Sequence, residues 1–203
     1  MWNISPQTIF LLLILLSSTV FSIQAQQDQA TPKETAADLA LLYSAVDGDI
    51  EGVQKALDEG ANVNIRQPNT GQSPLMIASL RGHADLVQYL LTRSDTDPSV
   101  PEKDGYTPAH GAGFQGRAQV MKALHEAGIN VVDDFAQDGY APFHRACWGR
   151  REHHTETIQY LYEHASVDIH NFAAKNGKTC RDMTRNPDTI AYLEKTLLEK
   201  DEL

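Results

Sequence analysis

Apolar residues recur at helical spacing in the middle of the chain, where one face would be formed by Leu86, Val87, Leu90 and Leu91. Residues 31–34 read Thr-Pro-Lys-Glu, the form of a capping box with Pro at the first helical position. They predict a helix to about Val46. Residues 50–59 would be its partner, with Gly60 as the C-terminal stop. A charged helix is predicted over about residues 187–200. The pattern favours paired helices.

A short motif returns at a constant interval along the chain. It reads Gly-x-x-Pro at 71–74, 105–108 and 139–142, and each copy is followed at the same offset by a small residue: Ala78, Ala112 or Ala146. Such a recurrence marks stacked units, each unable to bury its apolar face alone. The small residues would let neighbouring helices approach closely. Stacked copies of one unit form a long surface, whereas a catalytic pocket needs unlike residues from distant segments. The repeat therefore points toward binding.

The residues inside the unit resemble the ankyrin signature G-x-T-P-L-H. Residues 105–110 and 139–144 carry it with substitutions at the Thr and Leu places, and 71–78 is a looser copy. Residues 82–87 resemble the start of an ankyrin second helix, and 59–64 and 127–131 resemble its ending. The resemblance covers about residues 36–198. It implies an all-α ankyrin-repeat solenoid of stacked helix-turn-helix units joined by hairpin loops, with His110 and His144 in structural roles.

The expected organisation has five parts. Residues 1–25 are predicted to be a signal peptide and 26–35 a leader into the first helix. Four repeats would follow within 36–175, at 36–69, 70–103, 104–137 and 138–175. Residues 176–199 would be a degenerate capping repeat, and 200–203 a retention tetrapeptide. Repeat four is longer, because Gly177 follows Gly139 at a greater distance than Gly139 follows Gly105. The extra residues are expected near 148–154, between its two helices.

Two terminal segments predict the compartment. An apolar run at 9–16 is followed by Ser17, Ser18, Thr19 and then Ala25, which resembles the core and cleavage site of a secretory signal peptide, although no Lys or Arg precedes it. The run is shorter than the ~20 residues of a spanning helix, so no stable membrane insertion is expected after cleavage. The last four residues, Lys200, Asp201, Glu202 and Leu203, resemble the receptor-read K-D-E-L signal. The expected location is the lumen of the endoplasmic reticulum.

The net charge of the chain limits the classes of partner that it can bind. A net charge of −10 argues against a nucleic-acid binder, which would need a basic stripe. We expect a monomer without cofactors, whose partners are the retention-signal receptor and another protein.

No residue is assigned to catalysis or to a metal. Adjacent His153 and His154, with Cys147 and Glu152 nearby, do not match known metal-ligand spacings, and no nucleophile motif occurs. Cys147 and Cys180 would lie on neighbouring first helices, about a helix diameter apart and several residues out of step. That separation should exceed the ~7 Å Cα limit for a bridge, so no disulfide is predicted.

A row of large side chains predicts the binding face. Val46, Leu80, Phe114 and Trp148 recur at the interval of the motif on the expected exposed side of the first helices, and we call these four residues the ladder. The predicted partner-binding residues are Val46, Leu80, Arg81, Tyr106, Phe114, Gln115, Tyr140 and Trp148. Four large apolar groups on one strip would exceed the scattered singles of an ordinary surface. If the ladder instead packs as core, the site would move to the hairpin tips at 67–70, 99–104 and 135–138.

The sequence thus predicts an endoplasmic-reticulum-resident, non-catalytic adaptor that binds another protein. One alternative is a lumenal accessory protein that sequesters a metal or Ca²⁺ through its acidic surface. Another is a secreted effector whose terminal tetrapeptide is incidental.

Overall fold

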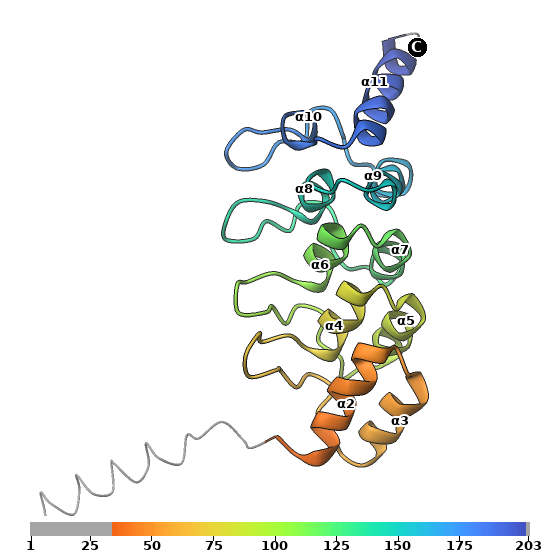
Figure 1. Cartoon of the computed structure of the whole chain (residues 1–203), viewed down its shortest axis with the longest axis vertical. Helices are drawn as coiled ribbons and strands as arrows, with labels where there is room; N and C mark the ends of the chain where they lie inside the picture. The colour runs from red at the N-terminus through yellow and green to blue at the C-terminus, as the bar shows by residue number, and fades with distance from the viewer. Residues whose placement is uncertain (1–33, 202–203) are drawn as a thin grey trace, which may run out of the picture. The chain divides into compact units, whose positions relative to one another are not determined.

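The computed structural model describes residues 34–201, and every regular element within them is a helix. The helices belong to the compact unit Ala36–Leu203 (Figure 1). In chain order they are α2 (Ala36–Asp47), α3 (Ile50–Asp58), α4 (Pro74–Arg81), α5 (Ala84–Thr92), α6 (Pro108–Gln115), α7 (Ala118–Glu126), α8 (Pro142–Cys147), α9 (Glu152–His164), α10 (Cys180–Met183) and α11 (Pro187–Asp201). The predicted all-α ankyrin-repeat solenoid is confirmed.

The helices form two columns. The first helices of each pair, α2, α4, α6, α8 and α10, stack directly on one another, and the second helices form the adjacent column (Figure 1). Long loops project from the side of the first-helix column, away from the second helices. One continuous core runs between the columns, and its fully buried members include Leu41, Leu90, Phe143 and Ile158. Each pair is thus stabilised by its neighbours, as in other repeat proteins.

The signature residues set the ends of the first helices. Ser73 caps α4, because its Oγ accepts a hydrogen bond from the backbone N–H of Met76 at 3.2 Å. Gly82 ends the helix in the left-handed region, with φ of 89°. Ala141, which precedes α8, has no hydroxyl group. There the backbone N–H of Ala141 donates to Nδ1 of His144 at 3.1 Å, so the histidine satisfies a group that would otherwise be left unpaired at the helix start.

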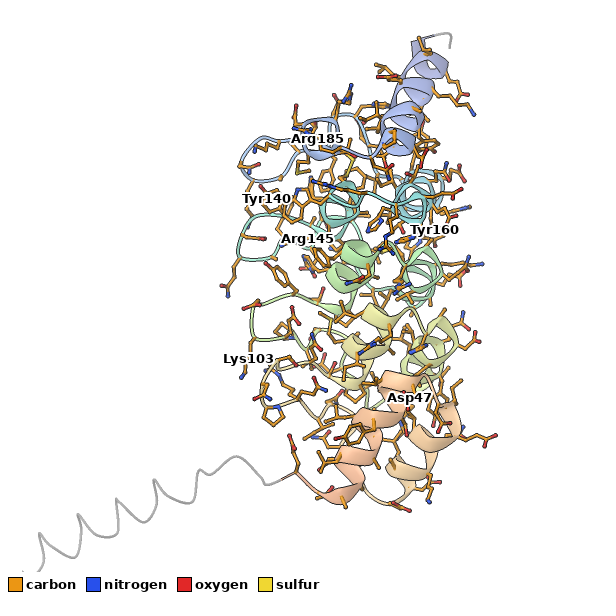
Figure 2. All side chains as sticks on the ribbon, in the orientation of Figure 1. Asp47, Lys103, Tyr140, Arg145, Tyr160 and Arg185 are labelled. Atoms are coloured by element: carbon orange, nitrogen blue, oxygen red, sulfur yellow. A yellow bond between two sulfur atoms is a disulfide. The ribbon has the colours of Figure 1, made fainter. Side chains whose placement is uncertain are left out.

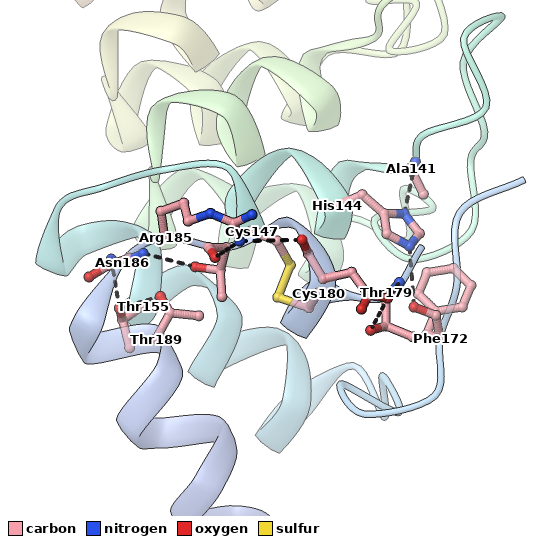
Figure 3. Close-up of a disulfide and its surroundings, with 12 residues drawn as sticks. Ala141, His144, Cys147, Thr155, Phe172, Thr179, Cys180, Arg185, Asn186 and Thr189 are labelled. Atoms are coloured by element: carbon pink, nitrogen blue, oxygen red, sulfur yellow. Dashed lines mark hydrogen bonds between the residues drawn. A yellow bond between two sulfur atoms is a disulfide. The ribbon is translucent and has the colours of Figure 1, made fainter. Parts of the chain in front are cut away.

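The prediction that the two cysteines remain unpaired is wrong. Cys147 and Cys180 form a disulfide, and their Cα atoms lie 5.3 Å apart (Figure 3). The same contact occurs one repeat earlier, where a Cβ at Gly113 would overlap the carbonyl oxygen of Pro142. The end of one first helix therefore lies against the start of the next. Positions that are out of step in the motif are therefore neighbours in space, so the offset between Cys147 and Cys180 brings their Cα atoms together.

Two helix boundaries also differ from expectation. Glu34 and Thr35 are not helical and α2 begins at Ala36, so a helix continuous from residue 32 is wrong. The first turn is held instead by Asp38, whose Oδ1 accepts from the backbone N–H of Asn62 at 2.8 Å. In repeat four the extra residues mostly lengthen the start of the second helix, because α9 has 13 residues whereas α5 and α7 have 9.

The predicted signal peptide at 1–25, residues 26–33 and the terminal Glu202 and Leu203 lie outside the described residues. Of the tetrapeptide, Lys200 and Asp201 end α11, which matches the predicted charged helix at 187–200.

Candidate protein-binding face

The predicted partner-binding residues differ in exposure. Phe114 is 54% exposed, the most open member of the ladder. Arg81 is also exposed, and the others are half-buried: Val46, Leu80, Tyr106, Gln115, Tyr140 and Trp148. The ladder is thus neither a fully exposed strip nor ordinary core.

The ends of the first helices are clamped by the following repeat. The imidazole Nε2 of His83 lies 2.9 Å from the carbonyl oxygen of Val46, and Nε of Arg117 donates to the carbonyl of Leu80 at 3.2 Å. These acceptors lie in the last turn of a helix or at its end, where carbonyls lack intrahelical donors. The clamps tie the ends of α2 and α4 to the repeat that follows each of them.

Four of the predicted residues line one groove. It has a volume of about 410 Å³ and lies over α4 and α6 and the loop before each. Its lining is Gln72, Met76, Leu80, Glu102, Tyr106, His110, Gly111, Phe114, Gln115 and Arg145. The structure therefore brings Leu80, Tyr106, Phe114 and Gln115 together. The remaining four, Val46, Arg81, Tyr140 and Trp148, are not part of its lining.

Arg145 is a functional candidate that the sequence argument missed. Arg145 lies on α8 in the first-helix column (Figure 2). Its guanidinium lies 4.4 Å from the ring centre of Tyr106 and 4.7 Å from that of Trp148, and it pairs with Asp138. Only 6% of its surface is exposed. Burial acts to raise the pKa of Asp138, but hydrogen bonds, first of all from Arg145, lower it overall. A buried, paired arginine thus packs against the aromatic rings around it and forms part of the groove lining.

Trp148 packs against Tyr140 as well as against Arg145. Its ring lies 4.6 Å from that of Tyr140, and the Tyr140 hydroxyl accepts from Nδ2 of Asn176 at 2.7 Å. Tyr106 likewise donates to Asp138 at 3.2 Å. The two tyrosines therefore join successive loops.

The only signal in the sequence that pointed to Arg145 was its position, one repeat after Gly111. An arginine on a helix is usually a solvated surface residue, so its type gave no reason to place it at the groove.

The signature histidines hold the loops to the helices. Nδ1 of His110 lies 3.4 Å from the Thr107 backbone N–H and Nε2 lies 3.2 Å from the Tyr140 carbonyl oxygen. His144 repeats this with the carbonyl of Phe172 at 3.3 Å (Figure 3). Burial lowers the pKa of both imidazoles, which favours their neutral form.

Residues 34–201 contain no group of three or more His, Cys, Asp and Glu side chains placed to hold a metal ion. Within the same residues, no helix is both long and apolar enough to cross a membrane.

Comparison with known families decides the classification. A family model described as ankyrin repeats (three copies) matches residues 11–100 and 41–133, and an ankyrin-repeat model matches 138–172. The chain belongs to the ankyrin-repeat family. Ankyrin repeats form a protein–protein interaction domain, and membership of the family suggests non-catalytic protein binding. The first match begins at residue 11, within the stretch predicted as a signal peptide.

Curated relatives share the repeats within much longer proteins. The chain is 33% identical over 105 residues to serine/threonine-protein kinase 12 of Arabidopsis thaliana, covering 51% of this chain and 21% of the kinase. It is 30% identical over 131 residues to inactive serine/threonine-protein kinase TEX14 of Mus musculus, covering 64% of this chain and 9% of that protein. It is 41% identical over 69 residues to human 2-5A-dependent ribonuclease, covering 34% of this chain and 9% of the ribonuclease. This ankyrin-repeat chain thus spans about a fifth or less of each, and their enzymatic names describe those proteins.

Proposed function

We propose that this ankyrin-repeat protein resides in the lumen of the endoplasmic reticulum and binds another protein as a non-catalytic adaptor. The observation that carries the binding role is the groove beside Phe114. A large aromatic side chain stands 54% exposed at the wall of a groove lined by residues of three successive repeats. Aromatic anchors beside such depressions are typical of interface hot spots.

Three observations support the compartment. The Cys147–Cys180 disulfide suits an oxidising lumen, since disulfides are rare in the cytosol. The apolar run at 9–16 resembles a signal peptide core, and residues 200–203 resemble a retention signal. The retention receptor would then be a second partner, one that reads only the terminal tetrapeptide.

The compartment is tested by blocking the terminus. Cells expressing the protein with two glycines added after Leu203 should release it into the medium, whereas the unaltered protein should stay in the endoplasmic reticulum. Release of both forms would favour a secreted effector. Retention of both would point to retention by a bound partner.

The binding role is tested by a matched pair of substitutions. Phe114→Ser should abolish capture of lumenal proteins by the purified adaptor. Leu198→Ser removes a comparably exposed apolar group, 66% exposed on α11, and should leave capture unchanged. Equal capture by the two variants and the unaltered protein would sink the assignment of the face.

A further inference from the structure

One residue that lines the groove has no side chain. Tyr43, Ile77, Gly111 and Arg145 occupy the same place in successive first helices, one repeat apart. Gly111 alone among them has no side chain, and it lines the groove together with Leu80 and Tyr106. A Cβ at Gly111 would lie 3.1 Å from Cδ2 of Leu80 and 3.2 Å from Sδ of Met76. These distances are shorter than ordinary van der Waals contacts, so Leu80 and Met76 pack closely against Gly111 and form the groove lining together with it.

The walls suit a large apolar side chain. Among the residues that line the groove, Met76 and Gly111 are buried. Leu80, Tyr106 and Phe114 keep part of their surface in contact with solvent. Its volume of about 410 Å³ lies within the ~300–1,000 Å³ of small-molecule and cofactor sites, which is enough to admit a large side chain. Burying an apolar side chain of a partner here would remove apolar surface of both molecules from water.

The charges of the groove do not cancel. Arg145 is neutralised by Asp138 and covered by aromatic rings. Glu102 is half-buried and accepts a hydrogen bond from the neutral amide of Gln72 at 2.9 Å. Among the described residues Glu102 forms no ion pair, so the groove keeps a negative charge, on a chain whose net charge is −10.

We propose that the groove binds a linear segment of the partner protein in which a large aliphatic or aromatic side chain stands beside a Lys or Arg. The apolar side chain enters the space above Gly111, and the basic side chain pairs with Glu102. This rests on the proposed function and specifies the chemistry of the partner. Charge complementarity favours a Lys or Arg beside the apolar side chain of the partner. An Asp or Glu at that place would be repelled by the like charge of Glu102.

Three blocked peptides on a common Gly-Ser background test this, carrying Leu-Lys, Leu-Glu or Ser-Lys at their centre. Each is titrated into the purified ¹⁵N-labelled protein in its oxidised form. We expect the Leu-Lys peptide to shift the amide resonances of Gly111 and Phe114 with an affinity about fivefold or more above the other two. Glu102→Lys should transfer the preference to the Leu-Glu peptide. Glu156→Lys, on the exposed surface of α9, should leave it unchanged.

Occupation of the space is tested by filling it. Gly111→Leu should abolish the shifts. If that variant does not fold, Phe114→Ser removes an exposed wall of the groove and should lower the affinity for the Leu-Lys peptide several-fold. Equal affinities for the Leu-Lys and Leu-Glu peptides, or the absence of shifts at Gly111 and Phe114, would overturn the proposal. Shifts of the same amides on concentrating the protein alone would assign the groove to a second copy and also overturn it.

The two proposals fail separately. If the peptides show no preference while Phe114→Ser still abolishes capture of lumenal proteins, the binding face stands and the chemistry of its occupant is wrong. If capture survives Phe114→Ser, the proposed function itself falls.

Discussion

Nε2 of His154 lies 3.2 Å from the carbonyl oxygen of Phe114, so repeat four holds the end of α6 beneath the exposed aromatic ring. His83 and Val46 form the same clamp in the first interface, as do Arg117 and Leu80 in the second, at a separation of 37 residues. Here the separation is 40 residues. The insertion in repeat four is absorbed at the start of α9, and a histidine slightly later in the repeat takes over the clamp.

We expect His154→Ala to destabilise the protein by about 2–3 kcal/mol, because it leaves a cavity and deprives the Phe114 carbonyl of its donor. Urea unfolding at pH 7.5 would measure the loss. His164→Ala, an exposed position of the same helix, should change stability by less than about 0.5 kcal/mol. Similar stabilities for the two variants would show that the clamp contributes nothing.

The disulfide should stabilise the junction between repeat four and the cap. It closes a loop with a sequence separation of 33, and its loss should lower the free energy of unfolding by about 3–4 kcal/mol. Denaturant unfolding with and without reductant would measure this, with thiol titration to verify reduction. The double variant Cys147→Ala and Cys180→Ala should be as unstable as the reduced protein and insensitive to reductant. A reduced protein with an unchanged midpoint would contradict the prediction.

Two glycines of α6 should respond differently to a methyl group. Gly113→Ala drives Cβ into the backbone oxygen of Pro142, which cannot give way as a side chain can. A net loss of about 1–3 kcal/mol is expected despite the better helix propensity of alanine. Gly111→Ala meets only side-chain atoms of Leu80 and Met76, at 3.1 to 3.2 Å, and should change stability far less because side chains can shift. Thermal unfolding of the two variants would measure both changes in stability. An unchanged stability of Gly113→Ala would contradict the close contact between Gly113 and Pro142.

Stability should fall on mild acidification. Burial lowers the pKa of His110 and His144 in the folded protein, so the unfolded chain takes up protons first. Their contribution is complete above the ordinary histidine pKa of about 6.5 and is lost as the pH falls below it. Urea unfolding between pH 7.5 and 5.5 would show the decline. Replacing both residues by Gln should flatten this dependence, although His153, whose pKa burial also lowers, retains part of it. An unchanged slope would contradict the assignment.

The ladder should divide into binding and structural members. Phe114→Ser, at an exposed site, should alter stability by about 0.5 kcal/mol or less. Trp148→Ser removes the ring that packs against Tyr140 and Arg145 and should lower the free energy of unfolding by more than about 1 kcal/mol. Differential scanning calorimetry of the two variants would separate them. Equal losses would mean that Phe114 also supports the fold.

Features that depend on one repeat could be predicted from the sequence. The phase of the units, the starts of α4, α6 and α8 at a proline, and the structural histidines follow from local turn and capping chemistry that recurs with the motif. The charged helix α11 follows likewise. Because each unit repeats the same local interactions, its copies reinforce one interpretation.

Features between repeats were decided by tertiary structure. The Cys147–Cys180 bond depends on the stagger of neighbouring helices, which brings residues at different positions of the motif into contact. The groove is lined by Gly111 together with residues of the neighbouring repeats, and Arg145 matters because its long side chain reaches the preceding repeat. The sequence by itself determined the repeating unit and the row of candidate contacts. Only the packing of unlike side chains across the interfaces decided which members of that row stay open to a partner, since burial is set by neighbours far apart in the chain.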